Sequence, residues 1–366
     1  MNISMKGFVP LIILFQLLVS GCESFQGDTS PPPEPMSPPD SAKALVRVMF
    51  ATNRNLIQER FTCAGMFGAE RATLSYGYCD VSIPPDHRIG VIESPSWLSF
   101  EFREDEEKHI TLRDGRAFTK QQFDDYLYSY LQEDGATFIY VHGYNVGFED
   151  AAKRTAQMAY DLKFKGVPAF FSWPSKDAFE AYPADEATVE WAELGLYRFL
   201  VDYLKRPDVK KMYLIAHSMG NRAVTTSIVR LYEQHPDLKS KLREIVLAAP
   251  DIDTGVFTDK IAPAIAAGQR PVTLYASSKD RALIASKEFH DYSRIGDSTE
   301  VLVLPGIETI DASLIKTGFL GHSYYGDSDS LIADMYVLFG DGKRASDRFR
   351  LKKYSTDAGD YWKFLP

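Results

Sequence analysis

Short, continuous apolar runs alternate with helical patterns along most of this chain, and this alternation constrains the fold more than any other feature. The runs expected to form strands are Val46–Ala51, Tyr76–Ile83, Leu98–Arg103, Ile110–Leu112, Thr137–Val141, Val167–Ser172, Lys211–Ala216, Glu244–Ala249, Val272–Ala276 and Glu300–Leu304. The expected helices are Lys120–Leu131 with Thr119 as N-cap, Glu149–Lys163, Ala187–Leu204, Asn221–Gln234 and Asp329–Phe339. Strands that are apolar on both faces belong to sheets covered by helices on both sides. The sequence therefore predicts one α/β domain, residues 45–366, with a mostly parallel central sheet.

The first 44 residues do not fit this pattern. The apolar stretch Phe8–Val19 is too short for a membrane-spanning helix, which needs about 20 residues. Residues 1–21 are therefore predicted to be a signal peptide, and the proline-rich residues 22–44 an extended tether. The small residues before Cys22 resemble a bacterial lipobox, which implies that Cys22 is lipidated and holds the protein at a membrane. An ordinary signal peptide with an incidental cysteine is the alternative.

The net charge and the cysteines indicate which partners and which cellular location to expect. The net charge of −9 argues against a nucleic-acid partner, because such proteins neutralise phosphates with basic residues. Glu23, in place of the aspartate that retains many enteric lipoproteins in the inner membrane, implies by analogy the outer membrane of a bacterial envelope. Cys63 and Cys79 remain once Cys22 is assigned to lipid, and they form either a disulfide or two reduced, buried cysteines. The oligomeric state is not encoded in any pattern that we recognise.

The segment that carries chemistry begins with the strand Lys211–Ala216. A small-x-Ser-x-Gly turn follows, with Ser218 between Ala216 and Gly220, and then a helix. A serine at such a sharp turn has a strained backbone, so the residues two before and two after it must be small. The turn exposes the hydroxyl, and the Met219 N–H at the start of the helix points to the same place. We therefore predict Ser218 as a nucleophile, with an incidental turn serine as the alternative.

Several segments together resemble a family of bacterial α/β-hydrolases, described as esterase/lipase-like proteins of unknown function. The segments are Phe67–Arg71, Leu74–Gly77, Ile83–Gly90, Val141–Asn145, Phe148–Ala151, Phe171–Ser175, Ala216–Asn221 and Tyr361-Trp362. The resemblance spans roughly residues 46–364. It implies the α/β-hydrolase fold, with helices on both faces of the sheet, and hydrolytic chemistry.

The loop after the strand Thr137–Val141 is the second element of the expected site. It reads His142-Gly143-Tyr144-Asn145, and in this fold the loop at this place supplies the second amide of the oxyanion hole. Gly143 lets the backbone approach the substrate. We expect the Tyr144 N–H to be the donor, with Asn145 as a side-chain contributor and His142 in a structural role.

A Ser-His-Asp triad needs an acid after the nucleophile in the sequence. Asp280 follows the strand Val272–Ala276 and is the preferred acid. Asp251 and Asp253, one strand earlier, are the rivals, and turn chemistry is their alternative role.

The general base is predicted from its position in the chain. His322 is the histidine that follows the last predicted strand, and glycines flank its loop. His290 is the competitor. The remaining histidines are expected to take no part: His87, His109 and His235 are interpreted as surface residues, and the His217 side chain as pointing away from the turn. The pKa near 6.5 of an ordinary imidazole suits a general base.

These residues predict two-step acyl transfer to water from a small-molecule ester. No His or Cys spacing resembles a metal site, and no glycine-rich loop could cradle phosphate, so we expect neither metal nor cofactor. Two alternatives stay open: a non-catalytic, lipid-anchored binding protein on the same fold, and a thioesterase, amidase or peptidase on the same triad. Four aromatic residues form either an apolar cap over the site or ordinary core: Trp173, Phe179, Tyr182 and Trp191.

Overall fold

The computed structural model describes residues 43–57, 62–96, 101–131, 134–280, 286, 291–315 and 329–365. All of them fall in one compact unit, Asp40–Pro366. The predictions for the signal peptide, the tether, Cys22, His290 and His322 lie outside the described residues. None of the described helices is long and apolar enough to cross a membrane.

Within the described residues, eleven strands form one sheet in the order β10-β11-β9-β8-β7-β6-β4-β5-β1-β2-β3. The strands are β1 (Ala44–Leu56), β2 (Phe67–Ile83), β3 (Thr111–Phe118), β4 (Ala136–Val141), β5 (Val167–Ser172), β6 (Lys211–His217), β7 (Leu242–Ala248), β8 (Val272–Ala276), β9 (Glu308–Asp311), β10 (Leu351–Thr356) and β11 (Gly359–Phe364). The pairs from β1 across to β11 are parallel, whereas β1–β2, β2–β3 and β10–β11 are antiparallel. The predicted mostly parallel sheet is confirmed.

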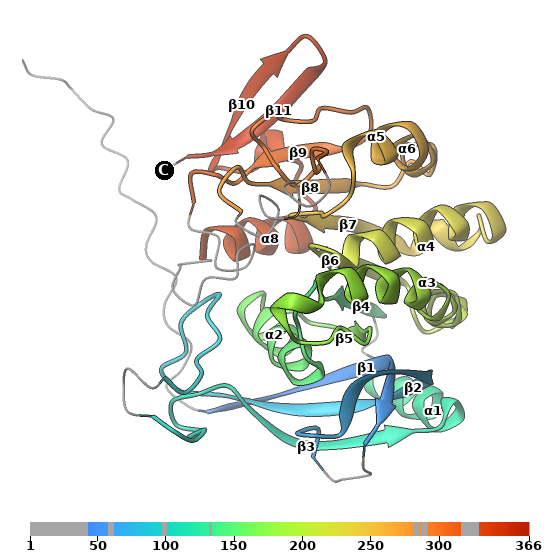
Figure 1. Ribbon diagram of the computed structural model, residues 1–366, viewed down its shortest axis with the longest axis vertical. Helices are drawn as coiled ribbons and strands as arrows, with labels where there is room; N and C mark the ends of the chain where they lie inside the picture. Colours follow the sequence, from blue (N-terminus) through green and yellow to red (C-terminus); the bar gives the residue numbers. More distant parts are fainter. Residues whose placement is uncertain are drawn as a thin grey trace, which may run out of the picture. The chain divides into compact units, whose positions relative to one another are not determined.

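Helices cover both faces of this sheet (Figure 1). They are α1 (Lys120–Tyr130), α2 (Phe148–Asp161), α3 (Tyr182–Lys205), α4 (Gly220–Gln234), α5 (Thr254–Val256), α6 (Ala262–Ala267) and α8 (Asp329–Asp341). Buried side chains of α1, α3, α4 and α6 belong to one core cluster, and those of α2 and α8 to the other. The two clusters lie on opposite faces of the sheet, because successive residues of each buried strand alternate between them.

The strand order reverses beside β4, and this reversal positions the site. The chain runs from β4 to β5 on one side and then returns to β6 on the other side of β4. Helices α2 and α4 therefore leave the carboxyl ends of β4 and β6 toward opposite faces (Figure 1). In open α/β sheets this switch point leaves a crevice in which ligands bind.

Two strand predictions were wrong and one hairpin was missed. Glu300–Leu304 forms no strand, because the Pro305-Gly306 turn reverses the chain and Glu308–Asp311 takes the place beside β8. The predicted strand Leu98–Arg103 is not formed at residues 101–103, and residues 98–100 lie outside the described set. The hairpin of β10 and β11 was missed because β10 is largely exposed and so lacks an apolar run.

The helix predictions agree with the structure within a few residues, with one exception. Thr119 caps α1 as predicted: its hydroxyl accepts from the Gln122 N–H at 3.2 Å, and the Gln122 side chain accepts from the Thr119 N–H at 2.9 Å. Helix α3 begins at Tyr182 rather than at Ala187. The earlier start follows from Pro183, whose fixed φ suits the first turn of a helix.

Two of the histidines interpreted as surface residues are buried. His87 lies between two carboxylates, with Nε2 2.9 Å from Asp161 and Nδ1 2.9 Å from Glu93. Burial alone would lower the His87 pKa, but the hydrogen bonds to these carboxylates outweigh it and raise the pKa to about 9. His109 is only 3% exposed. Both imidazoles lie within hydrogen-bond distance of carboxylates of the fold, and the spacing of histidines in the sequence does not reveal such contacts.

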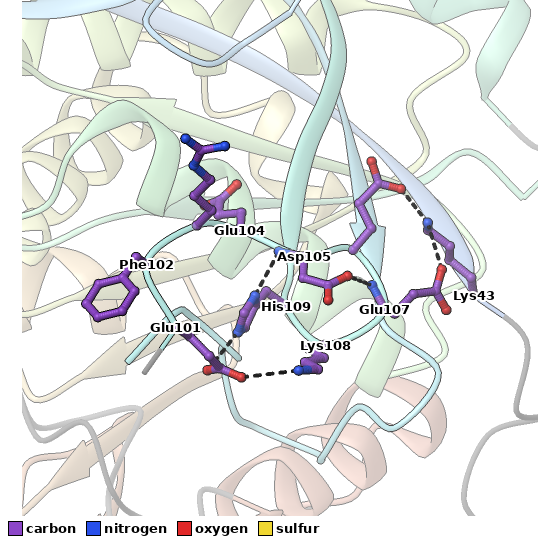
Figure 2. A pocket seen from close by; sticks show the side chains of 10 residues that line it. Lys43, Glu101, Phe102, Glu104, Asp105, Glu107, Lys108 and His109 are labelled. Atoms are coloured by element: carbon purple, nitrogen blue, oxygen red, sulfur yellow. Dashed lines mark hydrogen bonds and ion pairs between the residues drawn. The ribbon is translucent and has the colours of Figure 1, made fainter. Parts of the chain in front are cut away.

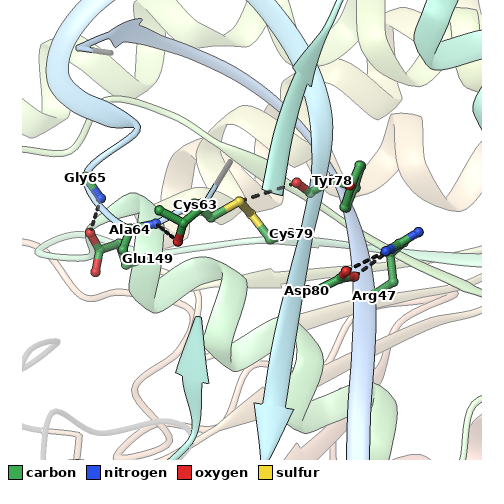
Figure 3. Close-up of a disulfide and its surroundings, with 9 residues drawn as sticks. Arg47, Cys63, Ala64, Gly65, Tyr78, Cys79, Asp80 and Glu149 are labelled. Carbon is green, nitrogen blue, oxygen red and sulfur yellow. Dashed lines mark hydrogen bonds and ion pairs between the residues drawn. A yellow bond between two sulfur atoms is a disulfide. The ribbon is translucent and has the colours of Figure 1, made fainter. Parts of the chain in front are cut away.

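Of the two alternatives for the remaining cysteines, the structure has the disulfide (Figure 3). Cys63 and Cys79 are joined with a Cα–Cα distance of 5.8 Å, within the usual range. Both cysteines are fully buried, and a Cβ on Gly115 would lie 2.3 Å from Cys63 Sγ, so Gly115 leaves room for the bridge. A ring of this size stabilises a fold by about 3 kcal/mol in the chain-entropy view.

Candidate active site at the strand switch point

The turn between β6 and α4 has the geometry expected of a nucleophile elbow. Ser218 has a φ of +48°, a left-handed conformation that is rare for a non-glycine residue. Four hydrogen bonds hold its backbone. Its N–H donates to the Ala248 carbonyl at 3.0 Å, and its own carbonyl accepts from the Asn221 N–H at 3.1 Å, from Asn221 Nδ2 at 2.9 Å and from the Asp251 N–H at 3.3 Å. Such strain persists only where the surroundings over-determine it.

Close packing explains why Gly220 is required two residues after the serine. A Cβ at this position would lie 2.3 Å from the His142 carbonyl oxygen and 3.0 Å from that of Val141. Because those atoms belong to the backbone at the end of β4, they cannot move aside easily. The start of α4 is therefore held directly against the loop that follows β4, and the Met219 N–H lies at the end of the helix where amides lack intrahelical acceptors.

Gly143 brings that loop into contact with the serine itself. A Cβ on Gly143 would lie 2.8 Å from Ser218 Cβ, so glycine alone fits there without a shift. This contact joins the two segments that sequence reasoning assigned to one site. Ser218 is only 6% exposed, which is less than the exposed hydroxyl that we expected at the turn.

The other members of this loop are held by its surroundings. His142 is fully buried and stacks on the Trp173 ring, and its carbonyl accepts from the Trp173 indole N–H at 2.8 Å. Burial, and then the Arg54 charge, lower the His142 pKa to about 3, so this imidazole is neutral. Tyr144 is buried with its ring against Tyr182, and Asn145 is left-handed, with a φ of +55°.

The three candidate acids differ in the hydrogen bonds and ion pairs that they make in the structure. The Asp251 carboxylate accepts from the Tyr182 hydroxyl at 2.5 Å and from Ser286 at 2.8 Å, and it lies 3.2 and 3.3 Å from the guanidinium groups of Arg222 and Arg294. This carboxylate is fully engaged in a structural network.

Asp253 is also used, as the N-cap of α5, where it accepts from the Val256 N–H at 2.8 Å. Asp280 is 3% exposed and follows β8, which is two strands from β6 in the sheet. Its N–H donates to the Ser277 carbonyl at 3.5 Å.

Neither candidate base, His322 nor His290, is among the described residues, but the segment that leads to His322 starts beside the Asp280 loop. The Ala312 N–H donates to the Ala276 carbonyl at 2.7 Å, and the Ser278 N–H donates to Ser313 Oγ at 2.8 Å. The described chain then ends at Ile315, seven residues before His322. These bonds place the start of the segment at the carboxyl edge of the sheet that also bears Ser218. Seven residues span at most about 25 Å.

Sequence reasoning missed a buried polar cluster at the ends of β1 and β5. Arg54 is 2% exposed and Asp185 is fully buried. The Ser175 hydroxyl donates to Asp185 at 2.6 Å, and burial raises the Asp185 pKa despite this bond. A charged residue at the carboxyl end of a buried strand was the available signal, because functional side chains collect at that edge of parallel sheets.

The aromatic residues between β5 and α3 divide between core and surface. Trp173 is fully buried against His142, so it belongs to the core. Trp191 is 42% exposed and lies under the Arg71 guanidinium. Tyr182 contacts Tyr144 and Asp251, so it reaches the loops of the site. The side chain of Phe179 lies outside the described set.

The structure also has a surface hollow of about 820 Å³, whose lining side chains are drawn in Figure 2. Lys43 and residues 101–109 line it, and apart from Phe102 the lining side chains are charged or imidazole. His109 accepts from the Asp105 N–H at 2.9 Å, and its other ring nitrogen lies 3.2 Å from Glu101. None of the predicted site residues lines this hollow. The described residues also contain no cluster of three His, Cys, Asp or Glu side chains that could hold a metal ion.

Comparison with known families agrees with this architecture. Residues 119–339, more than half of the chain, match the family described as alpha/beta hydrolase of unknown function (DUF900). The chain belongs to this family. The match spans β4, β6, α4 and β8, which carry the described site residues of this α/β-hydrolase.

Solved structures similar to this α/β-hydrolase include esterases. Est1E from Butyrivibrio proteoclasticus is 13% identical with a TM-score of 0.36, over 58% of this chain and 89% of that protein. The hyperthermophilic esterase from the archaeon Pyrobaculum calidifontis is 10% identical with a TM-score of 0.35, over 84% and 85%. At TM-scores below 0.5 neither likeness bears on function. No curated protein matches the chain.

The packing at Gly220 predicts a stability cost that a matched glycine lacks. In this hydrolase, Gly220→Ala forces a Cβ against the backbone of β4, and overpacking of this kind costs about 1–3 kcal/mol of unfolding free energy. Gly340→Ala is the control, since a Cβ there meets nothing within 4 Å and alanine favours the helix. Urea unfolding checks both variants. Equal midpoints for the two variants would contradict the packing argument.

Proposed function

We propose that this α/β-hydrolase is a serine hydrolase that cleaves carboxylic esters, with Ser218 as the nucleophile. The observation that carries the proposal is the left-handed backbone of Ser218 at the β6–α4 turn, in contact with Gly143. A left-handed conformation costs a non-glycine residue about 1–3 kcal/mol, and strain of this kind clusters at functional sites. It presents the serine between two loops whose amides can bind an oxyanion.

Asp280 is the proposed orienting acid. It is 3% exposed and follows β8, two strands from β6, at the carboxyl edge of the sheet that also bears Ser218. Asp251 binds two hydroxyl groups and two guanidinium groups, and Asp253 caps a helix. The position of Asp280 in the sheet supports it as the acid.

His322 is the proposed general base. Its segment leaves the carboxyl edge of the sheet beside Ser278, two residues before Asp280. His142, the histidine of the oxyanion loop itself, is unsuited to the task because its pKa of about 3 leaves too weak a base. The low pKa of His142 therefore supports a general base from outside the oxyanion loop.

In the proposed reaction His322 removes the Ser218 proton as the hydroxyl attacks the ester carbonyl. The Tyr144 and Met219 N–H groups bind the oxyanion of the tetrahedral intermediate, and Asp280 stabilises the imidazolium. The alcohol leaves with the proton from His322. Water then repeats the attack on the acyl-enzyme and releases the acid.

A fluorophosphonate probe tests the nucleophile. We expect covalent labelling of the wild-type chain and none of Ser218→Ala, because the probe reacts only with an activated serine. His322→Gln should lose kcat for a short-chain ester on the order of 10⁴-fold or more, with His290→Gln as the matched control that retains activity.

An unlabelled wild-type chain, or equal labelling of Ser218→Ala, would overturn the proposal in favour of a non-catalytic binding protein. A panel of matched esters, thioesters and amides then distinguishes the esterase from the other acyl-transfer enzymes on the same triad.

We also propose that Cys22 is lipidated and that residues 22–44 tether the domain to a bacterial envelope membrane, with the outer membrane as its location. The support is the small-residue sequence before Cys22 and the proline-rich segment after it. Acyl chains bind a bilayer with about 0.8 kcal/mol per buried CH₂, so several chains give stable attachment.

Membrane fractionation in a bacterial host tests the anchor. Cys22→Ser should move the protein from the membrane pellet to the soluble periplasmic fraction, and Cys63→Ser, which changes a cysteine of the domain, should not. Unchanged pelleting of Cys22→Ser would rule out the lipid anchor.

A further inference from the structure

A single buried guanidinium contacts four residues of three different segments around the site. From the end of β1, Arg54 Nε donates to Ser172 Oγ at 2.8 Å, and Nη2 donates to the Val146 carbonyl at 2.7 Å. Nη1 donates to the carbonyls of Gly68 at 3.2 Å and Ser175 at 3.1 Å. Burial lowers the Arg54 pKa to about 10, so the group is still charged at neutral pH. An arginine has only donors, and this fixes the direction of every bond it makes.

The direction is transmitted through Ser172 to His142. His142 Nδ1 lies 2.8 Å from the Gly143 carbonyl, which can only accept, so Nδ1 carries the proton. In the neutral ring Nε2 must then accept, and it lies 3.1 Å from Ser172 Oγ. Ser172 therefore accepts from Arg54 and donates to His142. The bonds run one way: Arg54 to Ser172 to His142 to the Gly143 carbonyl.

The last bond of this relay acts on the peptide unit that joins Gly143 to Tyr144. The described residues contain no cis peptide, and in a planar trans unit the C=O and the N–H point in opposite directions. Holding the Gly143 carbonyl against His142 therefore turns the Tyr144 N–H to the other side. We propose that Arg54, acting through Ser172 and His142, is the positioning residue that aims the Tyr144 N–H into the oxyanion hole.

This inference rests on the proposed function, because it takes the Tyr144 N–H as an oxyanion donor. Arg54 touches no reacting atom. Its role is to favour one polarity. Ser172 is fully buried, and its hydroxyl already accepts from Arg54, so its own proton is satisfied by donation to His142 Nε2. In the opposite tautomer that proton would lose this acceptor, and Nδ1 would be bare and would repel the Gly143 carbonyl. Rotation of that peptide unit would relieve the repulsion and withdraw the Tyr144 N–H from the site.

The same guanidinium also holds the far end of the oxyanion loop. Its bond to the Val146 carbonyl fixes the residue at which the loop turns into α2 (Phe148–Asp161). Asp185 supports the intervening backbone, since it accepts from the Asn145 N–H at 3.5 Å and from the Lys176 N–H at 2.9 Å. The loop is thus constrained on both sides of Tyr144.

Ser172→Ala is the sharpest test, because it breaks the relay with the loss of one oxygen atom. We expect kcat for an ester to fall about 10²-fold with KM within threefold, since an oxyanion donor acts mainly in the transition state. Binding of a trifluoromethyl ketone, which forms the tetrahedral adduct, should weaken by a similar factor. Ser172→Thr keeps the hydroxyl and should restore most of the activity, and Ser227→Ala, a buried serine of α4, should change neither quantity.

The ¹⁵N spectrum of the His142 ring supplies a readout that does not depend on activity. We expect a neutral ring with the proton on Nδ1 between pH 5 and 9 in the wild type, and a shift toward the Nε2–H tautomer in Ser172→Ala. An Nε2–H tautomer in the wild type overturns the proposal whatever the activity. A folded Ser172→Ala variant with wild-type kcat overturns it as well.

The two proposals fail in different ways. If the wild-type chain is not labelled by a fluorophosphonate, the serine hydrolase is refuted while the tautomer measurement still decides the relay. If the wild type is labelled and hydrolyses esters but Ser172→Ala matches it, the relay alone is refuted. Arg54→Met should reproduce the Ser172→Ala defect; if that variant does not fold, the outcome for Ser172→Ala stands on its own.

Discussion

The left-handed backbone at Ser218 is the constraint on which the rest of the site depends. Its cost of about 1–3 kcal/mol is offset by four hydrogen bonds from the flanking elements, each of which contributes about 0.5–1.5 kcal/mol. Those partners come from the end of β7, from the loop that follows it and from the first turn of α4. The strained turn therefore exists only when β6, β7 and α4 are packed together. The left-handed conformation of Ser218 is stabilised by the tertiary fold rather than by its local sequence.

Buried charges organise the loops around this turn, and each of them is satisfied by several partners. Arg54 donates to backbone carbonyls of three segments, and Asp251 binds Tyr182, Arg222 and Arg294 beside the Ser218 turn. Burying a charge is costly unless it is paired and hydrogen-bonded, so networks of this kind contribute little net stability. What they contribute here is geometry: they hold loops from β1, β4, β5 and β7 in one arrangement at one edge of the sheet.

Local patterns predicted the elements whose burial is uniform. The strands from β4 to β8 are apolar on both faces, and the strand–turn–helix at Ser218 is continuous in sequence, so both could be predicted. The Arg54–Ser172 hydrogen bond joins residues that are 118 positions apart in the sequence, so no local pattern predicts it. Val301–Leu304 has the composition of a strand but packs without pairing, and β10 pairs without being apolar. In these cases the partner strand in the sheet determines whether a segment forms a strand, and that partner is not evident from the local sequence.

The central claim concerns two atoms, the hydroxyl oxygen of Ser218 and an imidazole nitrogen of His322. A crystal structure of the chain after reaction with a small phosphonate tests it most directly. We expect phosphorus bonded to Ser218 Oγ, one phosphonyl oxygen about 2.7–3.1 Å from the amide nitrogens of Tyr144 and Met219, and His322 within about 3.2 Å of Ser218 Oγ. Phosphorus on another residue, or an imidazole other than that of His322 beside the adduct, would contradict it.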